Sequence, residues 1–368
     1  MLLRDSGCGL TVTFPMSART IISGKLNLVL RRKIIRYAFG IFLCSAIAFG
    51  IGWPVSYLSI VLVNVFLLGK EISFKAGINF LMQVIIAVVF SLLITTYLLS
   101  YQLIFSLLIG LILLLIFYLK DSQVSPILKT WLLISVLLIP FVSLIDPSVG
   151  QVTGLALIVG TVVAISVTWI AQGLFPDIKV ETHDEHQQAV TAPDAKTPYD
   201  RYVAAIKRTA VVYPVVLLFY YFDWQSGALI LIYIGMYSSF PGFAKDLSVG
   251  RLLLLGCIIG GIIALLLYEI VALVPIYTFL LLLMFGFALW AGDEILLGRK
   301  YASQIKAGFS TIIIIFGSAV GSDDVDAGGE VFIRFIQVSS VVVYLVVAFG
   351  LLEKIFPEKV SSKSQEQK

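Results

Sequence analysis

Long apolar runs, separated by short polar segments, fill most of the chain. A helix needs about 20 mainly apolar residues to cross the hydrocarbon core of a bilayer, and about 17–25 are tolerated. The shorter runs draw on flanking residues to reach this length. The pattern therefore predicts twelve membrane-spanning helices, at about residues 37–52, 54–69, 76–99, 102–119, 128–145, 150–173, 207–222, 224–240, 250–271, 273–292, 303–320 and 331–352.

The basic residues distinguish the two sides of this arrangement. With twelve spans, both termini and every second loop lie on one side, which then carries 25 of the 26 Lys and Arg residues. Because loops that stay in the cytoplasm are enriched in Lys and Arg, we expect both termini to be cytoplasmic. The cytoplasmic face then has a net charge of about +10, which favours the approach of anions. Membrane insertion alone accounts for the same asymmetry.

Composition agrees with a polytopic membrane protein and excludes other classes. Of the 368 residues, 59% are apolar and 13% charged, and the mean hydropathy is +1.01, whereas a soluble domain carries about 25% charged residues. This excludes a soluble enzyme, a nucleic-acid-binding protein and a disordered chain. The three cysteines show no CxxC spacing, and the spans hold no catalytic constellation of His, Asp or Ser. We therefore expect no enzymatic activity, no metal site and no cofactor.

The two halves of the chain repeat one another. A basic residue opens the first span of each half, Arg36 and Arg208, and a tryptophan marks the first outer turn, Trp53 and Trp224. Matched basic residues also open the third and fifth spans, and each half closes with Phe-Pro. Because each half has an even number of spans, both insert in the same direction. This predicts an all-α polytopic membrane protein built from two parallel six-helix repeats.

The domain organisation follows from the repeat. We expect a cytoplasmic N-terminal tail (1–32), a first six-helix membrane repeat (33–176), a cytoplasmic linker (177–204), a second six-helix membrane repeat (205–357) and a cytoplasmic tail (358–368). Transporters of this design place the substrate path at the interface between the repeats, and we expect the same here.

Six cations at the cytoplasmic ends of the odd-numbered spans form the main candidate site. If these spans line the interface, the cations ring the inner mouth and bind carboxylates through charge-assisted hydrogen bonds. The alternative is that each side chain extends to the lipid headgroups. The set consists of Arg36, Lys75, Lys129, Arg208, Arg251 and Lys306.

Two smaller groups of residues complete the candidates. The amides Asn64, Gln83 and Gln337 lie deep in apolar runs and are candidate substrate contacts, although hydrogen bonding between helices explains such residues as well. Asp146 and Asp223, at outer ends of spans, are candidates for proton coupling. Solvation at the outer edge is the simpler explanation for both carboxylates.

Several short motifs resemble one family. They are Arg36-Tyr-Ala-Phe-Gly40, the turn Gly52-Trp53-Pro54 and Lys75-Ala-Gly77, with Arg251 and Gly256 as counterparts in the second half. The chain resembles the fusaric-acid-resistance and aromatic-acid-exporter family over residues ~30–357. The resemblance implies export of aromatic carboxylic acids across a bacterial inner membrane, often beside a periplasmic membrane-fusion protein. The chain differs from the long exporters in having no large cytoplasmic domain between or after its halves.

Two functions follow from these observations. The first is a secondary transporter that exports weak organic acids and is not driven by ATP, because no Walker motif is present. The second is a non-transporting membrane scaffold, or an assembly partner of an efflux complex, which the scarcity of polar residues in the spans favours. We expect membrane lipid and a small organic anion as partners, and homo-oligomerisation stays open. A major-facilitator transporter is disfavoured because residues 69–75 lack the Asp-Arg-x-Gly-Arg-Arg signature of that family.

Overall fold

The computed structural model describes the backbone of residues 16–69, 71–119, 126–176, 198–222, 247–320 and 327–355, and of five residues between 230 and 238. The described residues form eleven helices and no strand. The helices are α1 (Met16–Ile51), α2 (Tyr57–Leu68), α3 (Phe74–Leu98), α4 (Gln102–Tyr118), α5 (Pro126–Ser143), α6 (Pro147–Leu174), α7 (Pro198–Phe222), α9 (Leu247–Leu273), α10 (Tyr277–Leu296), α11 (Ala302–Val320) and α12 (Ala327–Ile355).

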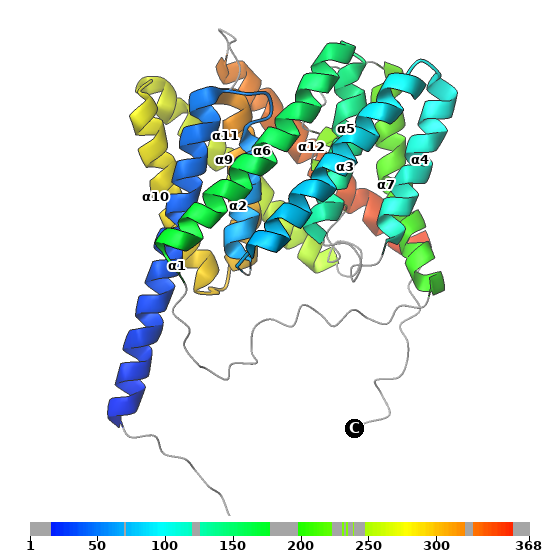
Figure 1. Ribbon diagram of the computed structural model, residues 1–368. Helices are drawn as coiled ribbons and strands as arrows, with labels where there is room; N and C mark the ends of the chain where they lie inside the picture. Colours follow the sequence, from blue (N-terminus) through cyan, green and yellow to red (C-terminus); the bar gives the residue numbers. More distant parts are fainter. Residues whose placement is uncertain are drawn as a thin grey trace, which may run out of the picture.

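These helices lie where the apolar runs predict spans, and most boundaries differ by a few residues. Helix α7 begins nine residues before its predicted span, inside the range assigned to the linker. The span expected at 224–240 lies mostly outside the described residues, although its described positions are helical. The clearest difference is α1, which begins at Met16 inside the range assigned to the N-terminal tail. At 36 residues and about 1.5 Å per residue, α1 is about 54 Å long. Its first part therefore projects beyond the bundle (Figure 1).

The chain has the properties of a multi-pass membrane protein. In its described part, six helices are long and apolar enough to cross a membrane, and five more helices contain a shorter apolar stretch. Large apolar side chains such as Leu103, Leu107 and Leu111 of α4 are exposed on the surface, where hydrocarbon would cover them. The short helix α2 has only 12 residues, and ten of these are buried by other helices. A short helix is tolerated at membrane depth because protein, not lipid, surrounds most of it.

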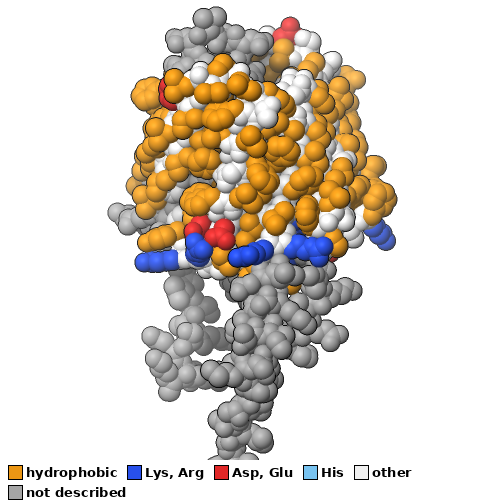
Figure 2. Space-filling view, turned by 90° about the vertical axis from the view of Figure 1, so that its left-hand side faces the viewer, with side chains coloured by type: hydrophobic (Ala, Val, Ile, Leu, Met, Phe, Trp, Pro, Cys, Tyr) orange, Lys and Arg blue, Asp and Glu red, His pale blue; other side chains and the backbone are white. Residues whose placement is uncertain are grey.

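The two ends of the bundle differ in charge. The membrane-spanning part of α1, and α3, α5, α7, α9 and α11, all begin at the lower end in Figure 1, and α6 and α12 end there. We call this end the basic end. The Lys and Arg side chains that the structure describes lie within about the first three turns of these helices or in the α10–α11 turn. Figure 2 shows them as a band along the lower edge of an apolar surface.

The helices of the two halves of the chain interlock. Within the first half, α3 packs against α5 and α6, and within the second half α9 packs against α11 and α12. Between the halves, α1 lies along α10, α2 contacts α11, and α4 lies along α7. Helices α1 and α2 therefore lie among helices of the second half, as Figure 1 also shows.

Glycines bring α9 and α11 into close contact. A Cβ atom added at Gly260 of α9 would lie 2.7 Å from the Cα of Gly308 in α11, and Gly256 faces the backbone of Gln304 in the same way. The obstacles are backbone atoms, which cannot move aside as a flexible side chain can. Small residues allow this approach, which is a common way of joining helices in membranes. The two helices therefore form a closely packed pair, and α11 carries the candidate cation Lys306.

We expect Gly260→Ala to lower the free energy of unfolding by about 1–3 kcal/mol, because the added methyl group overpacks a backbone contact. Thermal unfolding of the purified protein in detergent measures the effect. Gly286→Ala in α10 is the matched control, because no atom lies within 4 Å of a Cβ at that position. Equal unfolding temperatures for the two variants would contradict the close packing of α9 on α11.

Candidate functional site

The predicted cations all lie on helices that enter the bundle from the basic end, but their environments differ. Arg36 is buried and Lys129 nearly so, Arg208 is half-buried, and Lys75 and Lys306 are exposed. Arg251 lies in the first turns of α9, and its side chain is outside the described residues. The six positions share an end of the bundle without sharing one solvent-exposed ring.

Arg36 contacts hydrogen-bond acceptors within the protein and does not line an open cytoplasmic entrance. Its Nη1 lies 3.2 Å from a carboxylate oxygen of Glu71, in the connection between α2 and α3, and donates to the carbonyl of Phe175 at 3.5 Å. Phe175 is the C-cap residue of α6. The last carbonyls of a helix lack partners within the helix and carry a partial negative charge, which a guanidinium stabilises. Arg36 therefore joins α1 to the end of α6.

Lys129 makes the same kind of contact at another helix. Its ammonium group donates to the carbonyl of Leu119, the C-cap residue of α4. The exposed fraction of Lys129 is only 9%. Two members of the predicted set therefore stabilise helix C-termini in this conformation, a role that the sequence pattern does not indicate.

A chain of buried hydrogen bonds joins the two halves close to the basic end. The Tyr37 hydroxyl of α1 donates to the side-chain oxygen of Asn64 in α2 at 2.6 Å. The Asn64 amide in turn donates to the hydroxyl of Ser310 in α11 at 3.0 Å. Tyr37 and Asn64 are fully buried. We call these three residues the inter-half polar chain.

The local fold holds the inter-half polar chain in place. The Tyr37 ring lies over Gly292 of α10, where an added Cβ atom would come within 2.8 Å of the ring. Phe309 of α11 also packs near the Tyr37 ring, with ring centroids 6.2 Å apart. Ser310 donates to the carbonyl of Lys306, one turn earlier in α11, so the chain lies one helical turn from an exposed cation. A buried amide with both hydrogen-bonding functions used fixes the register of α2 against α11.

The structure does not bring the three candidate amides together. Gln83 is half-buried on α3, and its side chain makes no hydrogen bond within the described part of the chain. Gln337 is half-buried on α12, which packs against α9, α11 and α7 rather than against α1 or α2. Of the three amides, only Asn64 lies where the two halves meet, at the contact of α1 and α2 with α11, which we call the seam. No sequence motif distinguishes its partners Tyr37 and Ser310 from the other Tyr and Ser residues in the apolar runs. The sequence therefore gives no signal that could have identified them.

Asp146 has a local structural role. It is the N-cap of α6, and its carboxylate accepts a hydrogen bond from the backbone N–H of Ser148 at 2.7 Å. Hydrogen bonds from the hydroxyl and the backbone N–H of Ser148 lower the pKa of this carboxyl below its usual value. Such a group stays ionised near neutral pH, whereas a proton carrier needs a pKa close to the working pH. The other proton-coupling candidate, Asp223, lies outside the described residues.

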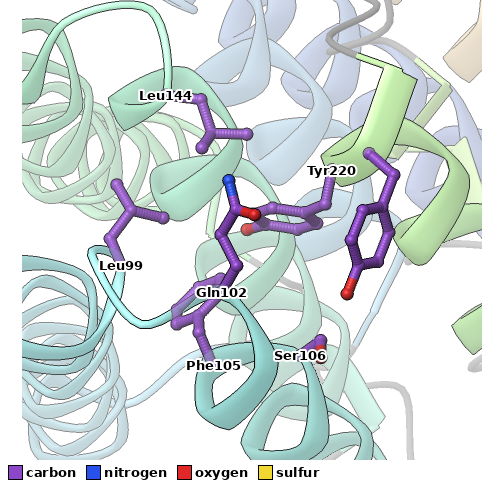
Figure 3. Close-up of a pocket in the computed structure, with 7 residues that line it drawn as sticks. Leu99, Gln102, Phe105, Ser106, Leu144 and Tyr220 are labelled. Atoms are coloured by element: carbon purple, nitrogen blue, oxygen red, sulfur yellow. The ribbon is translucent and has the colours of Figure 1, made fainter.

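A small cavity lies between α4 and α7 at the end opposite the basic end, and sequence patterns do not indicate it. Gln102 and Ser106 of α4 line it together with Tyr220 of α7, and Leu99 and Leu144 close its sides (Figure 3). The Tyr220 hydroxyl is buried and finds no hydrogen-bond partner among the described residues. A cavity with such a polar group can accommodate an ordered water molecule.

Comparison with known proteins gives one family match. The model of a family described as "Protein of unknown function (DUF2955)" matches residues 33–171. These residues run from the membrane-spanning part of α1 almost to the end of α6. The match does not confirm the resemblance to the aromatic-acid exporters. No curated protein and no solved structure matches the chain.

We expect Asn64→Leu to lower the free energy of unfolding by about 1–2 kcal/mol, because Tyr37 loses its acceptor inside the protein. Gln83→Leu is the matched control, since it removes an amide that makes no hydrogen bond in the described structure. Thermal unfolding in detergent compares the two variants. If Gln83→Leu proves as destabilising as Asn64→Leu, the inter-half polar chain does not hold the halves together.

The stability conferred by Asp146 should depend on pH in a defined direction. Because its pKa is lowered in the folded state, its contribution is present above the unfolded pKa of about 3.9 and is lost as the pH falls through the folded pKa. Asp146→Ala should therefore unfold at a lower temperature than the wild type at neutral pH. The difference should shrink in strong acid. A difference that is independent of pH would contradict the capping role.

Proposed function

We propose that the chain is a secondary transporter that exports weak organic acids, of the aromatic carboxylic class, from the cytoplasm across a bacterial inner membrane. Both termini lie in the cytoplasm, so the basic end faces inward, and the path runs between the two halves. The observation that carries the proposal is the inter-half polar chain. Polar residues inside a membrane bundle are costly, and a hydrogen-bonded group at the seam between two halves is a natural place for a substrate path.

The matched packing of helices supports a parallel repeat of six helices. Helix α3 packs on α5 as α9 packs on α11, and α4 lies along α7 as α10 lies along α1. Each pair is related by a shift of six helices in the chain. The family match over residues 33–171 also covers nearly the same residues as the first proposed repeat. Such a repeat has its symmetry axis along the membrane normal, between the halves.

Lys306 is the cation best placed to receive an anion from the cytoplasm. It is exposed at the basic end, and Ser310, one turn deeper on the same helix, belongs to the inter-half polar chain. A carboxylate bound by the Lys306 ammonium would therefore stand at the entrance to the seam. Arg36, Lys75, Lys129, Arg208 and Arg251 contribute positive potential at the same end, which raises the local concentration of anions.

Flux measurements in proteoliposomes test the proposal. Labelled 4-hydroxybenzoate should move only where the protein is present, and measurements with and without a pH gradient decide whether a proton gradient drives it. Lys306→Gln should lower the flux about tenfold, because a charge-assisted hydrogen bond to the substrate is lost. Lys300→Gln is the matched control, since its ammonium lies over the Tyr301 ring in the α10–α11 turn. Absence of flux for every aromatic or dicarboxylic anion tried would contradict the proposal.

The second candidate is a non-transporting scaffold or assembly partner of an efflux complex. The contacts of Arg36 and Lys129 with helix C-caps favour it, because these cations then serve the fold instead of a substrate. A periplasmic membrane-fusion protein and further copies of the chain are its proposed partners. Under this function, charge reversal at Arg36 and Arg208 should disrupt complex assembly and leave the sensitivity of cells to aromatic acids unchanged. A rise in sensitivity with the complex intact supports transport instead.

A further inference from the structure

Arg201, a cation at the basic end, has surroundings unlike those of Arg36 and Arg299. Arg201, in the first turn of α7, is partly exposed, and its guanidinium carbon lies 5.7 Å from the centroid of the Tyr118 ring at the end of α4. Its Nε is buried and has no hydrogen-bond partner among the described residues. Arg36 and Arg299, in contrast, each pair with carboxylates: Arg36 with Glu71, and Arg299 with two residues in the last turn of α10.

The position of Arg201 corresponds to the level of lipid headgroups. The apolar stretch of α7 begins at Arg201 and runs to Phe222. On the neighbouring helix α4, Leu115 and Leu111 are exposed one and two turns farther from the basic end than Tyr118, and Ile206 is exposed on α7 itself. Tyrosines and basic residues at the edge of an exposed apolar surface are typical of the membrane interface. An acyl chain covering α4 would thus bring its phosphate next to this guanidinium.

The charge at this position favours an anionic lipid. Lys207 and Arg208 follow on the next turns of α7, and Lys129 begins α5 beside the end of α4. A phosphate can accept hydrogen bonds from the guanidinium nitrogens while Tyr118 holds the guanidinium plane in place. In a zwitterionic headgroup an ammonium group offsets the phosphate charge, whereas an anionic headgroup keeps its full attraction to the basic end.

We propose that Arg201 and Tyr118 form a binding site for the phosphate of an anionic phospholipid, between the ends of α4 and α7. This site lies apart from the seam formed by Tyr37, Asn64 and Ser310, and it does not require that the protein transports anything. The lipid holds α4 against α7, which is one of the contacts between the two halves.

Native mass spectrometry of the full chain tests the site. The protein is released from nanodiscs of phosphatidylcholine that contain a minor fraction of phosphatidylglycerol, and the lipids that stay bound are identified. The wild type should retain phosphatidylglycerol in preference to phosphatidylcholine. Arg201→Gln should lower the affinity for phosphatidylglycerol about fivefold, as expected for one basic residue at a headgroup. Arg299→Gln should have no effect, because Asp293 and Glu294 already pair with that guanidinium.

One further variant and one further measurement complete the test. Arg201→Lys keeps the charge but lacks the planar guanidinium fork, so it should retain less phosphatidylglycerol than the wild type and more than Arg201→Gln. If the glutamine variant does not fold, the comparison of Arg201→Lys with the wild type carries the test. In nanodiscs of phosphatidylcholine alone, inorganic phosphate should not raise the unfolding temperature. An increase that depends on Arg201 would assign the site to a free anion and overturn the proposal. Equal retention of phosphatidylglycerol by Arg201→Gln and the wild type would overturn it as well.

Discussion

The hydrocarbon core of a bilayer offers no hydrogen-bond partners, and this constraint governs the arrangement of the whole chain. It makes the spans helical, because only a helix satisfies its own backbone, and it drives charge to the helix ends. The last carbonyls of each helix still need donors. Arg36 supplies one to the end of α6, and Lys129 supplies one to the end of α4. These two cations were predicted to belong to a substrate-binding ring, but in the structure they connect helices to one another.

The same constraint gives the buried polar groups their importance. Asn64 is fully buried and uses both functions of its amide, one toward Tyr37 and one toward Ser310. A polar group at this depth stays paired, so any movement of α11 away from α2 has to break these bonds or replace them. A substrate carboxylate or hydroxyl is a chemically suitable replacement. The inter-half polar chain thus connects the stability of the closed seam with the proposed path.

Three pairs of helices make the main contacts between the halves: α1 with α10, α2 with α11, and α4 with α7. Within the second half, α11 is also joined to α9 through glycines, and no side chains separate the two backbones there. The α4–α7 contact has Arg201 over Tyr118 at its basic end and the small cavity at its opposite end. The close packing of α9 on α11 suits a pair of helices that moves as a unit.

Apolar runs and charges, which are local properties, were enough to predict the helices and their common direction. The run lengths predict α3, α4 and α6 to within a few residues, and the positions of Lys75, Lys129 and Lys306 predict a basic end. The partner of each polar side chain depends on helices distant in the chain. Asn64 meets Ser310 across 246 positions, and Arg36 meets Phe175 across 139. Only the tertiary packing decides such pairs, because many arrangements of apolar helices satisfy the same hydrophobic pattern.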